Sequence, residues 1–383
     1  MLPPKAEASK QHLPSRKGLG VRRATHTRLA CLEGWDYVLL RAMPSAIKSL
    51  VRYAWAVLAY NLLVIVWGAY VRASGSGAGC GRHWPLCNGG LVSRSDSAKT
   101  LVEASHRVTS GIALLAVVVL MVWTLRALPR GHRARKASIA TTVFMFMEAA
   151  VGAGLVLFEL VATDKSMKRG LSMILHLDNT FLLLASLSIT AWTLTFDGES
   201  PAREGDLARS AARPAWLRPV VLLALLSVLV LGSSGAIAAL GDTLFPVASL
   251  REGFAQDLSP LAHVFLRLRV FHPFLALVAG ALVFASATLV RTARSSPRAR
   301  SLSRVVTLLF ATQFALGLLN MTLLAPVGIQ LAHLLLADAT WIALVLMGWE
   351  ALYAVAQSPI MSRKGPAPMS EVPPSTSSVD PVT

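Results

Sequence analysis

Eight long apolar stretches constrain the fold of this chain more than any other feature. Each has the roughly 20 residues that an α-helix needs to cross the ~30 Å hydrocarbon layer of a bilayer. The 383 residues are 54% hydrophobic and only 15% charged, which excludes an ordinary soluble domain. We therefore predict an all-α integral membrane protein with helices over residues 51–71, 102–125, 139–159, 171–195, 219–240, 262–290, 304–324 and 328–355.

The basic residues lie between these stretches and predict the orientation of the chain. Five Lys or Arg residues fall in 126–136, four in 203–218 and five in 291–304, while the loops between them carry fewer in total. Basic loops stay on the cytoplasmic side, so we expect both termini there. This placement accounts for the net charge of +17 without a nucleic-acid partner, because the basic residues do not gather on one helix face.

The second half of the sequence repeats the first. Gly68 corresponds to Gly232 in the second half. The segment 148–152, from Glu148 to Gly152, corresponds to the segment 313–317, from Gln313 to Gly317. Because both halves have the same orientation, the repeat predicts two four-helix bundles related by a pseudo-twofold axis along the membrane normal. The predicted domains are a basic cytoplasmic tail (1–50), a first bundle (51–196), a cytoplasmic linker (197–218), a second bundle (219–355) and a disordered tail rich in Pro, Ser and Thr (356–383).

Four histidines fall at the outer ends of alternate helices. His106, His176, His272 and His333 lie near the starts of the second, fourth, sixth and eighth stretches, which all run from outside to inside. Two facing imidazoles at one depth in a bundle can ligate a haem iron from both sides. A single histidine in such a helix is more often a buried residue with its hydrogen bonds made than a metal ligand. Four symmetry-related histidines instead indicate a haem-binding pair in each half.

The sixth stretch offers two histidines, His263 and His272, which point to opposite faces of a helix. Starting the membrane at His263 would leave Arg267 and Arg269 in hydrocarbon. We therefore place the boundary near Val270 and choose His272, followed by Pro273 as a helix start or kink.

Glu103, His106 and Arg107 form a polar cluster at the start of the second stretch. Charged side chains at a membrane edge are costly unless they are solvated, paired or ligating, so the cluster is a candidate site. The alternative is a solvated helix start in which Glu103 favours the positive end of the helix dipole. Deeper in the membrane, Glu148 is expected to hydrogen-bond within its bundle, whereas the loop residues His83 and His132 are expected to be solvated.

Cys80 and Cys87 lie in the first outer loop with six residues between them. The oxidising face permits a disulfide between them, either as a structural staple or as a redox-active pair. The spacing argues against a metal site. Cys31 lies on the reducing side and is expected to be unpaired.

These residues resemble haem A synthase, a membrane enzyme family of cytochrome oxidase biogenesis. The resemblance covers about residues 51–355. It rests on Gly75-Ser-Gly-Ala-Gly-Cys80, Trp84-Pro-Leu-Cys87-Asn-Gly, Glu103-x-x-His106-Arg107, and the further histidines His176, His272 and His333.

The resemblance implies an oxidoreductase that converts haem O to haem A by oxidising a ring methyl to a formyl group through an alcohol. It implies that His272 and His333 hold a resident haem b cofactor, while His106 and His176 bracket the substrate haem O. Glu103 would act at the oxidised methyl, as a proton acceptor or as a charge that stabilises an electron-deficient intermediate.

The resemblance also suggests that Arg107 pairs with a haem propionate. It implies a bacterial cytoplasmic membrane location with the haem sites near the outer face. The implied partners are the lipid bilayer, an electron donor and a haem O synthase, with a homo-oligomer left open.

The sequence departs from the family pattern in three places. Residues 241–261 lack the second cysteine pair of some members, Pro273 follows His272 where Arg107 follows His106, and the basic N-terminus is extra. The main alternative is a bis-histidine cytochrome b type electron carrier, which leaves Glu103 without a role. A transporter is the other alternative, but transporter helices break near the midplane, and these break at their outer ends.

Overall fold

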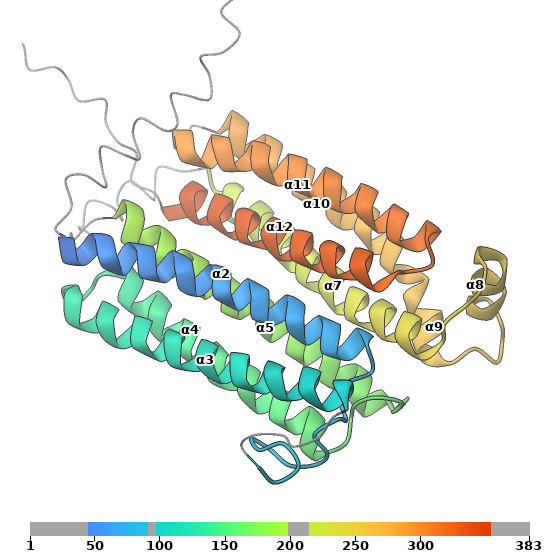
Figure 1. Cartoon of the computed structure of the whole chain (residues 1–383). Coiled ribbons are helices and arrows are strands. Elements are labelled where there is room, and N and C mark those ends of the chain that lie inside the picture. The colour runs from blue at the N-terminus through green and yellow to red at the C-terminus, as the bar shows by residue number, and fades with distance from the viewer. Residues whose placement is uncertain (1–44, 91–96, 198–213, 294, 354–383) are drawn as a thin grey trace, which may run out of the picture. The chain divides into compact units, whose positions relative to one another are not determined.

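The computed structural model describes residues 45–90, 97–197, 214–293 and 295–353, and they are mainly helical (Figure 1). Within these residues the sole β feature is an isolated bridge between Cys87 and Gly90. The helices are α2 (Ser45–Ala73), α3 (Ala98–Ala127), α4 (Arg133–Leu157), α5 (Met167–Phe196), α7 (Leu217–Leu244), α8 (Leu250–Asp257), α9 (Val264–Arg269), α10 (Phe271–Thr292), α11 (Pro297–Thr322) and α12 (Val327–Tyr353).

Eight membrane-spanning candidates are present among the described residues, with α9 and α10 together making one of them. This confirms the predicted all-helical integral membrane protein. Seven of the eight spans begin earlier than hydropathy indicated, and some of them begin with polar first turns. In α11, for example, the Ser296 side chain accepts the Ala299 N–H and Pro297 occupies the first turn, seven residues before the predicted start at 304.

The sixth span is broken where the sequence predicted a boundary. α9 ends at Arg269 and α10 begins at Phe271, so His272 lies in the first turn of the long helix. The Arg269 guanidinium pairs with Asp242 at 2.7 Å and with Asp257 at 2.5 Å. His263 caps α9 by accepting the Phe265 N–H. Arg269 is therefore ion-paired with two carboxylates, and the choice of His272 stays a prediction.

The long helices contact one another in two closed sets. In the first, α2 packs on α3 and α5, and α4 packs between α3 and α5; in the second, α7 packs on α10 and α12, and α11 packs between them. The sets meet where α5 contacts α7 and α12, and where α12 contacts α2. The division into two related four-helix bundles over 51–196 and 219–355 stays a prediction.

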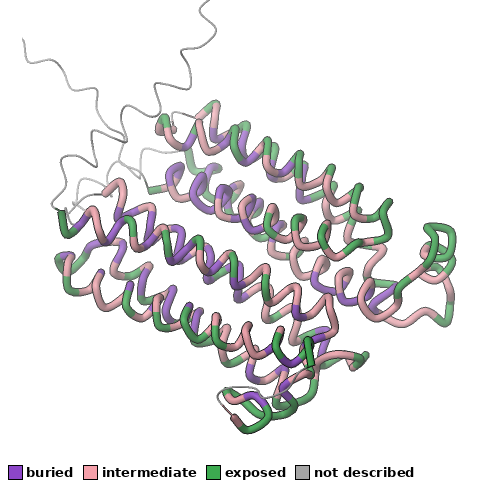
Figure 2. The backbone as a smooth tube through the Cα atoms, in the orientation of Figure 1, coloured by how far each residue is buried: buried purple, intermediate pink, exposed green. Residues whose placement is uncertain are grey.

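α5 and α12 are the most buried of the described spans, and Figure 2 shows buried, intermediate and exposed residues mixed along the helices. Large apolar side chains such as Leu63, Leu115 and Leu308 are exposed. Such a surface suits lipid and would be unfavourable in water. At the centre, the Trp341 indole donates to the Phe181 carbonyl at 2.6 Å and stacks on the Phe181 ring.

The expectation that His132 is solvated was wrong. His132 is 1% exposed and caps α4, with its Nδ1 accepting the Ala134 N–H at 3.1 Å. The first N–H groups of a helix lack partners within the helix, so a buried cap satisfies one of them. His83 is exposed, as expected. The predicted terminal tails and the linker lie largely outside the described residues.

Candidate functional site

The four predicted ligand histidines lie on four separate helices. His106 is in α3, His176 in α5, His272 in α10 and His333 in α12, each near the helix start. These four helices all begin at the end of the bundle where α8 lies (Figure 1). His106 lies within electrostatic range of His176, and His333 within range of His272. The structure thus brings the histidines together in the two expected pairs.

Each histidine ring faces a glycine on a neighbouring helix. A Cβ atom built on Gly68 would lie 2.8 Å from Cε1 of His106, and Cβ atoms on Gly235 and Gly317 would lie 3.1 and 3.0 Å from Cε1 of His272 and His333. The fourth contact is looser, since a Cβ on Gly152 would lie 3.9 Å from His176 Cε1. Side-chain-free helix surface therefore borders all four imidazoles.

The glycine contacts correct the register of the repeat. We expected Gly68 to correspond to Gly232, but Gly232 faces the Phe181 ring, where a Cβ would meet Cε2 at 2.7 Å. Gly235, three residues later, is the residue that faces His272. Sequence reasoning missed this relation because both glycines lie on the same helix. The correspondence of Gly152 with Gly317 holds, as both face a histidine.

The ring nitrogens have unequal surroundings. Nδ1 of His106 and Nδ1 of His333 are buried without a hydrogen-bond partner. His272 Nδ1 lies 2.9 Å from the Ser234 hydroxyl. His176 Nδ1 lies 3.1 Å from Glu148 Oε1, close enough for an ion pair although the angles do not fit a hydrogen bond.

Buried polar atoms without partners are costly and call for an explanation. Each imidazole packs against a glycine, and Nδ1 of His106 and of His333 has no partner, so these residues fit ligands that would bind a haem iron through one ring nitrogen. Three or more His, Cys, Asp or Glu residues do not cluster as a metal site in the described part of the chain. A bis-histidine haem requires two protein ligands only.

The disulfide loop is seated on the start of α3. Cys80 and Cys87 form the expected disulfide. The buried Glu103 carboxylate accepts the Cys80 N–H at 2.8 Å with Oε2. The Thr100 hydroxyl donates to the Gly79 carbonyl at 2.8 Å, and a Cβ on Gly79 would lie 2.7 Å from the α3 backbone. The loop and the helix therefore approach as closely as a glycine allows.

Arg107 completes this arrangement. Its guanidinium pairs with Glu103 Oε1 at 2.5 Å and also donates to the carbonyls of His83 and Leu86. The side chain is only 11% exposed. Arg107 is therefore committed to Glu103 and the loop, so these contacts lend no support to the predicted propionate contact.

Glu148 makes hydrogen bonds within its bundle, as expected. It accepts from Asn179 Nδ2 and from the Thr180 hydroxyl, both at 2.6 Å. Sequence reasoning identified this role but missed the contact with His176, because the two residues lie on different helices. Residue spacing alone does not specify which faces of two helices meet.

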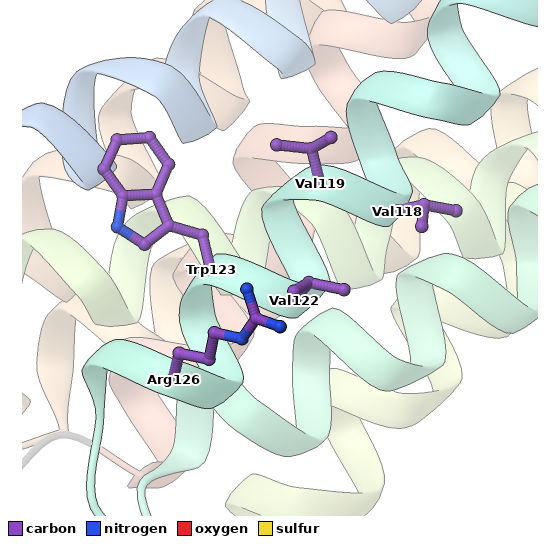
Figure 3. Close-up of a pocket in the computed structure, with 5 residues that line it drawn as sticks. All are labelled: Val118, Val119, Val122, Trp123 and Arg126. Atoms are coloured by element: carbon purple, nitrogen blue, oxygen red, sulfur yellow. The ribbon is translucent and has the colours of Figure 1, made fainter.

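A surface hollow lies apart from the histidines. It occupies about 370 Å³ on α3 and is lined by Val118, Val119, Val122, Trp123 and Arg126 (Figure 3). All five residues belong to the later turns of α3, and none is a predicted site residue. Trp and Arg near the end of a spanning helix are typical of the membrane interface. The hollow is therefore part of the lipid-facing surface.

The fold and these histidines define an integral membrane protein with a pair of helix-borne imidazoles in each half. A family model described as cytochrome oxidase assembly protein matches residues 51–345. The chain belongs to this family.

Several curated relatives support the assignment. A protein from Thermus thermophilus named protoheme IX farnesyltransferase is 45% identical over 306 residues, which are 80% of this chain and 49% of that protein. A heme A synthase from Geobacillus kaustophilus is 32% identical over 42% of this chain and 50% of its own length. A heme A synthase from Exiguobacterium sibiricum is 30% identical over 46% of this chain and 54% of its own length. The chain spans about half the length of these relatives.

Proposed function

We propose that this protein is a haem A synthase, which oxidises a ring methyl of haem O to a formyl group through an alcohol. The observation that carries the proposal is the pair of imidazoles in each half, each ring bordered by a glycine, in a chain of this family. Two haem sites suit an enzyme with one resident cofactor and one haem substrate. The heme A synthase relatives support the choice of reaction.

The two histidine pairs have different roles in this proposal. His272 and His333 hold a resident haem b, and His106 and His176 hold the substrate haem O. The bound haem supplies the oxidation chemistry, while the protein supplies ligation, orientation and electrostatics. The first pair is assigned to the substrate because His106 lies about one helical turn from Glu103, which accepts a hydrogen bond from the disulfide loop.

Glu103 acts as a fixed negative charge near the oxidised methyl. Both of its oxygens accept hydrogen bonds, from the Cys80 N–H and from Arg107. A carboxylate held in this way is oriented before the reaction begins and can stabilise developing positive charge. The geometry favours this role over that of a proton acceptor. In place of the propionate contact, we assign Arg107 to holding Glu103 and the loop.

The proposed setting is the bacterial cytoplasmic membrane, with both termini cytoplasmic and the haem sites near the outer face. The proposed partners are an electron donor and a haem O synthase. The Thermus relative supports the second partner, because its printed name describes a transferase that farnesylates haem, and this chain matches about half of its length. A product of such a transferase is the expected substrate here.

The proposal is tested by extracting the haems from protein purified from a host that also makes haem O, followed by chromatography. Haem b together with haem A or its alcohol precursor is expected. Haem b alone, with haem O available, would favour an electron carrier of the cytochrome b type. Protein without any haem would contradict both functions.

A further inference from the structure

Glu148 of α4 lies directly against His176 of α5. Its Oε1 is 3.1 Å from His176 Nδ1 and also accepts the Thr180 hydroxyl at 2.6 Å. Its Oε2 accepts from Asn179 at 2.6 Å. The carboxyl group is 17% exposed. Three contacts with one neighbouring helix therefore fix its position beside the imidazole.

The second half places an amide where the first half has this acid. Gln313 of α11 lies four residues before Gly317, as Glu148 lies four residues before Gly152. The Gln313 amide nitrogen donates to the His333 carbonyl at 3.0 Å and lies 3.3 Å from His333 Nε2. Gln313 therefore brings a donor nitrogen to Nε2 of His333, whereas Glu148 brings an acceptor oxygen to Nδ1 of His176.

The other two histidines have no acid at their rings. His272 Nδ1 contacts the Ser234 hydroxyl, and His106 Nδ1 is buried without a hydrogen-bond partner. The rings of all four candidate ligands belong to the described residues, and His176 is the one ion-paired with a carboxylate. The two halves are thus unequal in the groups that surround their ligands.

An acceptor at the second nitrogen of a metal-bound imidazole has a known effect. It fixes the tautomer, orients the ring and raises the basicity of the nitrogen that binds the metal. A stronger electron donor stabilises oxidised iron relative to reduced iron, and such groups are among the means by which a protein sets a haem potential. An amide that donates to the imidazole does not have this effect.

We propose that Glu148 is a positioning residue that makes His176 the strongest donor of the four ligands and gives the first-half iron a lower reduction potential than the second-half iron. This inference rests on the proposed function, because it requires a haem at each histidine pair. Its consequence is that ferric iron is favoured in the half assigned to the substrate. Gln313 leaves the resident haem at the higher potential.

The test is a redox titration, followed by visible absorbance at one pH, of protein purified from a host that makes haem O. Glu148→Gln should raise the first-half potential by about 59 mV, which corresponds to a tenfold change in a one-electron equilibrium. Gln313→Glu, which adds a negative charge beside the His333 ring, should lower the second-half potential. Glu148→Asp, which keeps the acid, should stay closer to the wild type than Glu148→Gln.

Two controls test whether each shift in reduction potential comes from the group beside the histidine of that half. Asn320→Asp makes the same amide-to-acid change on α11, seven residues beyond Gln313, and should leave both potentials unchanged. In a His106→Ala background, which removes a first-half ligand, Glu148→Gln should have no effect and Gln313→Glu should still act. A role for Glu148 confined to folding would not produce this pattern.

Unchanged potentials in Glu148→Gln, at normal haem content, would overturn the inference. If that variant fails to fold, Gln313→Glu decides, and an unchanged or raised second-half potential would overturn it. These outcomes are distinct from failure of the proposed function. That failure would appear in the wild type, as missing haem or missing product.

Discussion

Glu103 combines two tasks in one side chain. It is 3% exposed, accepts the Cys80 N–H and pairs with Arg107, so it holds the disulfide loop on α3. It also lies three residues before His106, on a neighbouring part of the same helix face. Glutamine in its place keeps an oxygen that can accept the Cys80 N–H but loses the negative charge.

Glu103→Gln should lower haem A formation by about 100-fold, the usual cost of losing one oriented electrostatic group in an active site. The haem b content should stay close to that of the wild type, because Glu103 touches neither His272 nor His333. Both quantities are read by chromatography of extracted haems. Glu159→Gln is the control, since Glu159 lies in the loop between α4 and α5 with a side chain 62% exposed. Undiminished haem A in Glu103→Gln would remove Glu103 from the mechanism.

At the scale of the helix, close packing against glycine defines where each histidine lies. Gly68, Gly235 and Gly317 have no room for a Cβ unless the facing imidazole moves, whereas Gly152 has ordinary van der Waals space. Alanine at any one of the four would gain about 1 kcal/mol of helix propensity. A loss of function would therefore come from the contact and not from the helix itself.

Gly235→Ala and Gly317→Ala should each reduce haem b content by more than about half, because the added methyl displaces an imidazole that should ligate iron. Gly152→Ala should leave haem content near the wild-type level. Gly111→Ala is the matched control on a helix, since no atom lies within 4 Å of its added Cβ. The measurement is the haem to protein ratio after purification. Equal haem in Gly111→Ala, Gly235→Ala and Gly317→Ala would show that the glycines do not shape the site.

The disulfide loop is expected to act as a structural element. Cys80 and Cys87 are 0% and 5% exposed, so their sulfur atoms are poorly placed for exchange with another thiol. Replacing both with Ser should cost about 2–3 kcal/mol by the chain-entropy estimate for a short loop. Limited proteolysis should then cleave the loop faster, while a substantial part of haem A formation remains. Complete loss of product with normal haem b and an intact loop would instead indicate a redox role.

The sequence predicted those parts of the fold that follow from the order of apolar and charged residues along the chain. Apolar length and charge placement gave the eight spans and the break near Val270, because a buried charge or a polar turn is visible in the residue order. The burial of His132 and the contact of Glu148 with His176 were missed, since both depend on which helix faces meet. The four histidines were chosen because they repeat, and their role as ligands stays a prediction.

At the scale of the whole molecule, the two helix sets are joined by α5 and α12. Arg72 of α2 adds a polar connection, donating to the Ala239 carbonyl at 2.8 Å and to Thr243 at 2.6 Å on α7, and to Gln330 at 3.2 Å on α12. Hydrogen bonds from a charged donor contribute about 1.5–3 kcal/mol each. This residue therefore links the first helix set to the second.

Arg72→Met should lower the thermal stability of the purified protein by several degrees, because three acceptors in the second set lose their donor. Thermal unfolding in detergent measures the effect. Arg52→Met is the control on the same helix, as Arg52 is exposed. Equal melting temperatures for the two variants would show that the Arg72 contacts do not hold the two sets together.

The central claim is that each half holds its own haem with its own pair of histidines. It is tested most directly by the haem content of four variants, each with one histidine replaced by Ala. We predict that His272→Ala and His333→Ala lose haem b. We predict that His106→Ala and His176→Ala keep haem b and lose haem O and haem A. The account would be contradicted if haem b survived in both second-half variants, or if all four variants lost the same haem.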